Sequence, residues 1–259
     1  MDVVPEESRD SLDTSPKDEQ NPLPLRAVLT RAVAISVLNY ATLALLEVVA
    51  LSLIPLIWST SVEFGGLNFS PASIGLCISV YGFMSGIFQF IFFPRLVGRF
   101  GPRWVLVASI AAYAVVYTMF PFENLALRYA VGGGSSMTLW LLIFLQLWSL
   151  AVSEMGYSEL LFVFFMGVRS QQLSGAAFIF IRSAAPNQRS LGATNGLAQT
   201  LGSVHRSFGP AAADWLFAFS LINNILDGKL IYVVLLALVC VAQSIAAQLP
   251  RHKWTHGGK

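Results

Sequence analysis

Long apolar runs separated by short polar breaks make up most of this chain. The runs cover about 32–58, 73–93, 104–120, 137–181, 191–219 and 230–249. A helix needs about 20 apolar residues to cross the roughly 30 Å hydrocarbon core of a bilayer, whereas a membrane strand needs only about ten. Because these runs are apolar on all sides, their length rather than their periodicity decides between helix and strand. The pattern therefore predicts an all-α integral membrane protein, built as a bundle of six transmembrane helices.

The composition agrees with this prediction, because 55% of the 259 residues are hydrophobic and only 12% are charged. A soluble domain carries about 25% charged residues, which keep its surface hydrated. The charges here crowd into the ends of the chain and the short breaks. We therefore expect a disordered tail or linker over 1–31, a transmembrane domain over 32–250 and a second tail over 251–259.

The basic residues of the short breaks predict the orientation of the bundle. Arg95, Arg99 and Arg103 lie between the second and third runs, and Arg182 and Arg189 precede the fifth. Basic residues also flank the first run (Lys17, Arg26 and Arg31) and lie in the second tail, whereas the alternate breaks carry few lysines or arginines. Because basic loops stay on the cytoplasmic side, we expect both termini to be cytoplasmic.

The fourth run is irregular. Glu154, Glu159 and the polar stretch from Arg169 to Gln172 interrupt its apolar residues. A separate crossing within this run would place Arg182 on the outside, against the charge bias. We therefore expect one irregular span, or a helix with a re-entrant hairpin, with an irregular insert over 158–174.

Ionisable groups within membrane spans are costly, which makes each of them a functional candidate. Glu47 lies near the middle of the first span. It is either a proton-accepting carboxylate or cation contact, or a structural hydrogen-bonding group, and both interpretations stay open. In the fifth span Asn195, Gln199, Ser203 and Arg206 recur at helical steps along one face. They could line a cavity or hold helices together, and Arg206 could snorkel to the cytoplasmic end. We favour packing for the row, with Asn195 and Gln199 the better cavity candidates.

Other chemistry is sparse in the sequence. Gln89 and Gln146 are weaker cavity candidates, Cys77 and Cys240 are isolated, and His205 lacks companion metal ligands. The sequence has no nucleophile elbow, phosphate-binding glycine loop, HExxH or CxxC motif. We therefore expect no enzyme activity, no cofactor, no metal site and no nucleic-acid partner.

The break RLVGRFGPRWV at 95–105 resembles the short cytoplasmic loop motif of the major facilitator superfamily. Arg99, Gly101 and Arg103 match that motif, in the degenerate form that is typical of the copy between helices eight and nine. The positions that depart from it are Pro94, Gly98 and Pro102. The resemblance implies that Arg99 and Arg103 are anchors that pair with acidic groups or helix ends and gate a rocking motion.

Two further segments carry the same resemblance more strongly. SAAPNQRSLGATNGLAQTLGSVHRSFGPA at 183–211 resembles the tenth loop and eleventh helix of fungal drug:proton antiporters, a group similar to plant zinc-induced-facilitator-like transporters. ISVLNYATLALLEVVALSLIPL at 35–56 resembles their seventh helix. The resemblance covers about 24–250 and corresponds to helices seven to twelve, the C-terminal half of the fold. Such a half supplies one wall of a substrate path between two six-helix bundles.

The resemblance implies proton-coupled transport of a small organic solute or drug-like compound across the plasma or vacuolar membrane. The implied partners are the lipid bilayer, the solute, protons, and an N-terminal six-helix half or a second copy. Two alternatives are an inactive transporter fragment from an incomplete gene model and a membrane scaffold. Family members lack the segment at 158–174, which is a retained intron or a genuine insertion.

Overall fold

The computed structural model describes residues 28–156, 176–187 and 190–249. Helices account for the predicted runs, and no strand occurs in these three ranges. The insert expected at 158–174, the second tail and nearly all of the first tail lie outside the described residues, so the predictions about them stay predictions.

Seven α-helices and two short 3-10 helices make up the described part of the chain. The α-helices are α2 (Arg31–Ser59), α3 (Pro71–Phe100), α4 (Pro102–Val131), α5 (Met137–Ser153), α7 (Ala176–Ala184), α8 (Leu191–Ile222) and α9 (Leu230–Ala247). The 3-10 helices are η2 (Val62–Phe64) and η3 (Glu154–Gly156). The third helix continues 11 residues beyond the predicted apolar run, to Val131, because its last turns carry polar groups that find protein partners.

Five of these helices are long and apolar enough to cross a membrane. They are α2, α3, α4, the continuous stretch of α5 and η3, and α9. This confirms the prediction of an all-α integral membrane protein for the described residues. The longest helix, α8, has 32 residues but is less apolar because it contains His205, Arg206 and Asp214.

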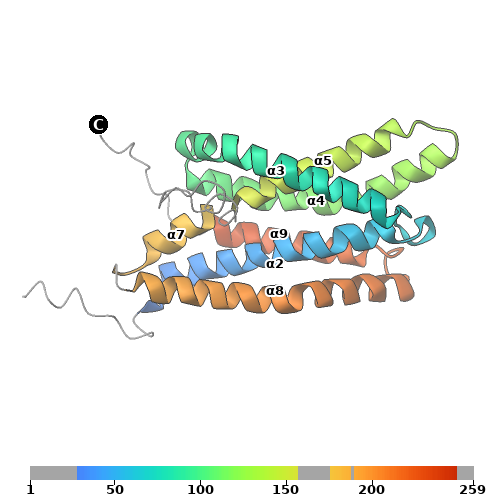
Figure 1. Ribbon diagram of the computed structural model, residues 1–259. Helices are drawn as coiled ribbons and strands as arrows, with labels where there is room; N and C mark the ends of the chain where they lie inside the picture. The colour runs from blue at the N-terminus through green and yellow to red at the C-terminus, as the bar shows by residue number, and fades with distance from the viewer. Residues whose placement is uncertain (1–27, 157–175, 188–189, 250–259) are drawn as a thin grey trace, which may run out of the picture.

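The helices lie side by side along one common direction (Figure 1). Helix α2 packs most extensively against α8, and α4 packs against α5 and α9. Burial shows which helices form the interior: 61% of the apolar stretch of α2 is buried, against 17% of that of α3. Helix α2 is therefore the centre of the bundle, and α3 lies at its edge.

Polar side chains join the central helices to each other. The Tyr117 hydroxyl of α4 donates to the Leu46 carbonyl of α2 at 2.7 Å, and both Tyr117 and its stacked neighbour Tyr113 are fully buried. A buried hydroxyl is stable only with a partner. The bond therefore fixes α4 against α2 near the middle of both helices.

Local sequence explains how α3 and α4 end and begin. The Ser70 hydroxyl accepts from the Ser73 backbone N–H at 3.2 Å and caps α3, as serine does at helix N-termini. Gly101 alone separates α3 from α4, with φ +81°. Only glycine takes this conformation without steric cost, so the chain reverses direction in one residue.

The opposite end of α4 holds a buried carboxyl group. The Trp58 indole N–H donates to Glu123 Oε2 at 3.1 Å, while Glu123 Oε1 is buried without a hydrogen-bond partner among the described residues. Next to it, the Asn124 side chain donates to the carbonyls of Val62 (3.0 Å) and Gly66 (2.7 Å) and holds the turn after α2. A single neutral donor is little compensation for a buried negative charge.

We predict that Glu123→Gln leaves the protein at least as stable as the native chain, whereas Glu123→Ala destabilises it. Glutamine keeps an acceptor for Trp58 and carries no charge. Alanine leaves the indole N–H buried and unpaired, which costs about 1–3 kcal/mol. Unfolding of the purified protein in detergent measures both variants. Equal losses for glutamine and alanine would show that the carboxylate charge itself stabilises the fold.

Candidate functional site

Helix α8 presents two different exposed strips along its length. One is apolar and consists of Val204, Phe208, Trp215 and Phe219, of which Phe208 is 71% exposed. The other is polar and consists of Gln199, Ser203, Arg206 and Ser207, with Asp214 further along. Lipid solvates the first strip but cannot hydrogen-bond to the second. The polar strip is therefore suited to an aqueous cavity or a protein partner.

An ion pair joins this polar strip to α2. Arg206 Nη2 lies 3.4 Å from Glu47 Oε2, and the two side chains are 36% and 19% exposed. Both residues lie about halfway along their helices. The Arg206 guanidinium thus turns to Glu47 rather than snorkelling to the helix end, because a carboxylate compensates its charge better than partial access to water does.

Two other residues of the predicted row on α8, Gln199 and Asn195, also direct polar atoms toward the bundle. The Tyr40 hydroxyl of α2 donates to Gln199 Oε1 at 3.2 Å. Asn195 Oδ1 is buried and has no hydrogen-bond partner among the described residues. The structure therefore gives Gln199 a helix-joining role and leaves Asn195 with an acceptor that is not used within the described bundle.

A second acidic group lies beside the first. Glu154, in η3, receives three hydrogen bonds from α3, one of them from the Tyr81 hydroxyl. The Ser85 hydroxyl donates to Glu154 Oε2 at 2.7 Å, and the Gln89 amide donates to the same oxygen at 2.9 Å. Gln89, predicted as a weak cavity candidate, is thus one of these donors.

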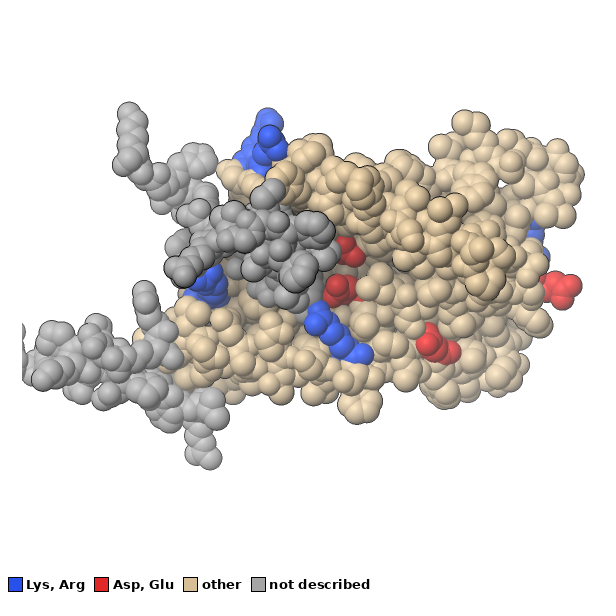
Figure 2. All heavy atoms as spheres, viewed as in Figure 1, with Lys and Arg blue, Asp and Glu red and all other residues tan. Residues whose placement is uncertain are grey.

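The two carboxyl groups belong to one site. Glu47 and Glu154 are close enough to interact electrostatically, and the fully buried Tyr113 of α4 interacts with both. We call the set of Glu47, Arg206, Glu154, Tyr81, Ser85 and Gln89 the mid-helix cluster. Its two carboxylates and one guanidinium leave one negative charge in excess when all three are ionised. Figure 2 shows acidic and basic side chains gathered near the middle of a mostly uncharged face, with others toward its ends.

Gln146 lies apart from the mid-helix cluster. Its side chain is fully buried, and its amide donates to the Val116 carbonyl of α4 at 3.1 Å. It joins α5 to α4 and is not exposed to a cavity in this structure. A glutamine in an apolar run can serve either role, and the sequence alone does not separate them.

The residues of the predicted loop motif lie at one end of the bundle, away from the mid-helix cluster. Arg103 Nη2 donates to the Ala247 carbonyl at the C-terminus of α9 at 2.8 Å, which agrees with the expected pairing to a helix end. Gly101 forms the reversal between α3 and α4. The Arg99 guanidinium lies 5.6 Å from the Phe100 ring centre. Whether these arginines gate a motion stays a prediction.

Sequence reasoning missed two acidic groups. Glu154 is not among the candidates predicted from the sequence, because it lies in an irregular run, although an acidic residue in an apolar run is itself a signal. Asp214 of α8 accepts from the Ser52 hydroxyl of α2 at 2.9 and 3.0 Å. It ties the same two helices together as the Glu47–Arg206 pair does, further along the bundle.

Several apolar helices with ionisable groups among them define the class of this molecule as a helical integral membrane protein, and its relatives are transporters. A probable peptide/nitrate transporter of Arabidopsis thaliana is 26% identical over 78% of this chain and 37% of its own length. Protein ZINC INDUCED FACILITATOR-LIKE 1 of the same plant is 27% identical over 63% and 29%. The major facilitator-type transporter psiT2 of Psilocybe cyanescens is 24% identical over 94% and 44%.

These comparisons support the resemblance to the major facilitator superfamily at low identity. The chain spans less than half the length of each of these relatives. No family model and no solved structure matches it.

We predict that Glu47 and Arg206 stabilise the fold as a pair. Glu47→Ala or Arg206→Ala alone removes one member of the mid-helix ion pair and leaves the charge of the other without it, whereas the double variant removes both charges. The double variant is therefore expected to lose less stability than the sum of the two single losses, by about 1 kcal/mol or more. Unfolding in mixed detergent micelles measures this double-mutant cycle. Additive losses would mean that the two side chains act independently.

Proposed function

We propose that the chain forms the six-helix C-terminal half of a major facilitator-type transporter, with the mid-helix cluster facing the solute path. The observation that supports this proposal most directly is the placement of Glu47, Arg206 and Glu154 halfway along the bundle, on the side where α8 exposes polar residues. Ionisable groups at membrane depth are retained where they face a cavity or a partner and handle ions or solutes. The similarity to curated transporters supports the same conclusion.

In this proposal α8 is the sixth crossing. Its 32 residues reach about 48 Å at 1.5 Å per residue, more than the roughly 30 Å hydrocarbon core. Its two charged residues, Arg206 and Asp214, lie on one strip, and both bond to α2. A helix of this kind is stable in a membrane because lipid contacts only its apolar strip, while α2 and the solute path contact the other.

We further propose that the transport is coupled to protons through Glu47. Protonation of Glu47 would weaken its attraction for Arg206 and loosen the contact between the two side chains, and deprotonation would restore the ion pair. Such an exchange changes the contacts between α2 and α8, the most extensive helix pair of the bundle. A proton and a solute that compete for one site are thereby coupled.

The proposed solute is a small organic compound, and its path needs a second wall. One six-helix bundle supplies half of a rocking transporter, which fits a chain that covers 44% or less of each of the three relatives. We propose an N-terminal half or a second copy of this chain as the partner. Each would bring its own surface against the polar strip of α8.

We predict that the full chain, reconstituted in liposomes with a pH-sensitive dye inside, couples movement of a solute to movement of protons. Nitrate, dipeptides and small organic amines are suitable probes. Glu47→Gln should abolish uptake driven by a pH gradient while exchange of labelled solute continues, because glutamine keeps the size of the side chain but carries no exchangeable charge.

Glu123→Gln is the matched control, since it removes a carboxyl from the same bundle at a place outside the mid-helix cluster and should leave uptake unchanged. If Glu47→Gln still accumulates solute against a gradient with unchanged pH dependence, Glu47 is not the coupling group. If the full chain moves none of the probes alone, and none when expressed with a six-helix N-terminal half, the proposed function is wrong.

A further inference from the structure

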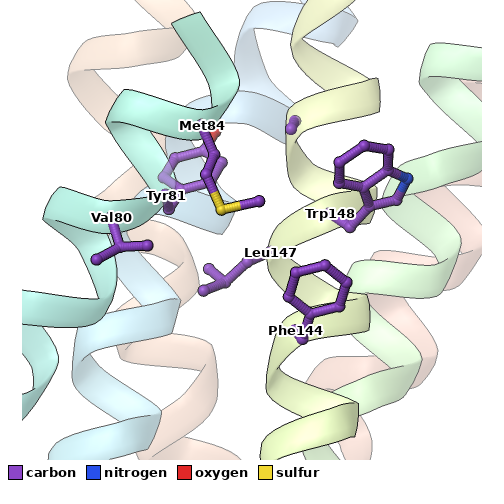
Figure 3. A pocket seen from close by; sticks show the side chains of 7 residues that line it. Val80, Tyr81, Met84, Phe144, Leu147 and Trp148 are labelled. Atoms are coloured by element: carbon purple, nitrogen blue, oxygen red, sulfur yellow. The ribbon is translucent and has the colours of Figure 1, made fainter. Parts of the chain in front are cut away.

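A pocket opens between α3 and α5 next to Glu154. Figure 3 shows three side chains of α3 facing three of α5 across it. They are Val80, Tyr81, Met84, Phe144, Leu147 and Trp148. The pocket has a volume of about 60 Å³, which is several times the space that one water molecule needs and fits a small apolar group. Its wall is almost wholly apolar, and three of its seven lining residues are aromatic.

The pocket and the carboxyl group of Glu154 are parts of one structure. Tyr81 belongs to both, because its ring lines the pocket and its hydroxyl donates to Glu154. Ala151 also lines the pocket and lies three residues before Glu154, about one helical turn. The pocket therefore adjoins Glu154 through Tyr81, although Glu154 itself is not one of its lining residues.

The charge of Glu154 has no cationic partner among the described residues. Between described residues, ion pairs join Arg206 to Glu47 and Lys229 to Asp227, and neither includes Glu154. The donors to Glu154 are a phenol, an alcohol and an amide, all neutral groups that orient the carboxylate without compensating its charge. A carboxylate held in this way attracts a cation that brings its own charge.

We propose that the pocket and Glu154 together bind an amphipathic organic amine, with its apolar or aromatic group in the pocket and its ammonium group at Glu154. This inference rests on the proposed function and names the class of solute. Aromatic rings add to the attraction because their faces stabilise a nearby ammonium, and Trp148 and Phe144 stack on each other at the pocket. Met84 adds a flexible wall that adapts to different apolar groups.

Other ligand classes fit these features less well. An organic anion would meet one more negative charge beside the excess that the mid-helix cluster already carries. A neutral apolar molecule, including a lipid chain, would fill the pocket but gain nothing from Glu154. Discrimination between amine, alcohol and acid with the same ring therefore tests the inference directly.

The test uses the full chain in lipid nanodiscs and titration calorimetry with three probes: 2-phenylethylamine, 2-phenylethanol and 3-phenylpropionate. We expect the amine to bind about tenfold or more tightly than the alcohol, since a hydrogen bond to a charged group distinguishes them. Binding of the acid should be weaker still. Glu154→Gln should weaken amine binding to the level of the alcohol and leave alcohol binding unchanged.

A second pair of variants tests the pocket. Val80 is 49% exposed at its rim, so Val80→Phe should fill the pocket without disturbing the core and weaken both amine and alcohol binding. Leu76→Phe, at a 67% exposed position one turn earlier on α3, is the matched control and should bind as the native chain does. Glu123→Gln controls for loss of a carboxylate outside the polar strip and the mid-helix cluster, and should also bind normally.

Equal affinity for amine and alcohol would overturn the inference, and so would amine binding by Glu154→Gln that is as tight as that of the native chain. Either result would indicate an apolar pocket that does not recognise charge. Undiminished binding by Val80→Phe would also overturn it. These outcomes are separate from those of the proposed function. Proton-coupled movement of nitrate or dipeptides without amine binding would contradict only this inference. Amine binding by a chain that transports none of the probes would contradict only the transport proposal.

Discussion

The free-energy cost of an ionised group in hydrocarbon governs this structure. Glu47 and Arg206 lie at mid-helix, where lipid offers neither hydrogen bonds nor counter-charges. The two charges compensate each other at a distance of 3.4 Å. The ion pair therefore fixes the orientation of α2 and α8 about their axes, because it determines which faces of the two helices meet. Once this orientation is fixed, apolar residues of α8 such as Phe208 and Trp215 point to lipid, and Ser203 and Ser207 lie on the polar strip.

The rest of the bundle follows from the central place of α2. It contacts α8 on one side and is bonded to α4 by Tyr117, and α4 in turn packs on α5 and α9. Helix α3 is the exception, since little of it is buried and its firmest polar contacts are those to Glu154. A helix with few apolar contacts moves more easily than its neighbours, so the wall of the α3–α5 pocket is the part of the bundle best suited to adapt to a ligand.

The fold could be predicted from the sequence to the extent that run length determines helices. The predicted run at 32–58 corresponds to Arg31–Ser59, but the run at 104–120 stops well before Val131. The polar residues Glu123 and Asn124 end the apolar pattern there, and tertiary bonds to Trp58 and to the turn after α2 satisfy them. An apolar pattern alone does not contain those bonds.

The candidate site was predictable only in part, for the same reason. Helical spacing placed Gln199 and Arg206 on one face, and depth in the span selected Glu47. The role of Glu154 depends on Tyr81, Ser85 and Gln89, which recur every four residues on a helix distant in the sequence. Nothing local to Glu154 shows that this row lies beside it. The same holds for the partner of Asp214, because Ser52 is 162 positions away along the chain.

Cysteine accessibility along α8 tests most directly whether the mid-helix cluster faces an aqueous path. In a background with Cys77 and Cys240 replaced by alanine, single cysteines at Ser203 and Ser207 probe the polar strip, and cysteines at Val204 and Phe208 probe the apolar strip at the same depth. A charged, membrane-impermeant thiol reagent reacts with the thiolate, which needs water. In a lipid bilayer, we predict rapid labelling at 203 and 207 and little at 204 and 208. Equal labelling of the two strips, or faster labelling of the apolar one, would contradict the account.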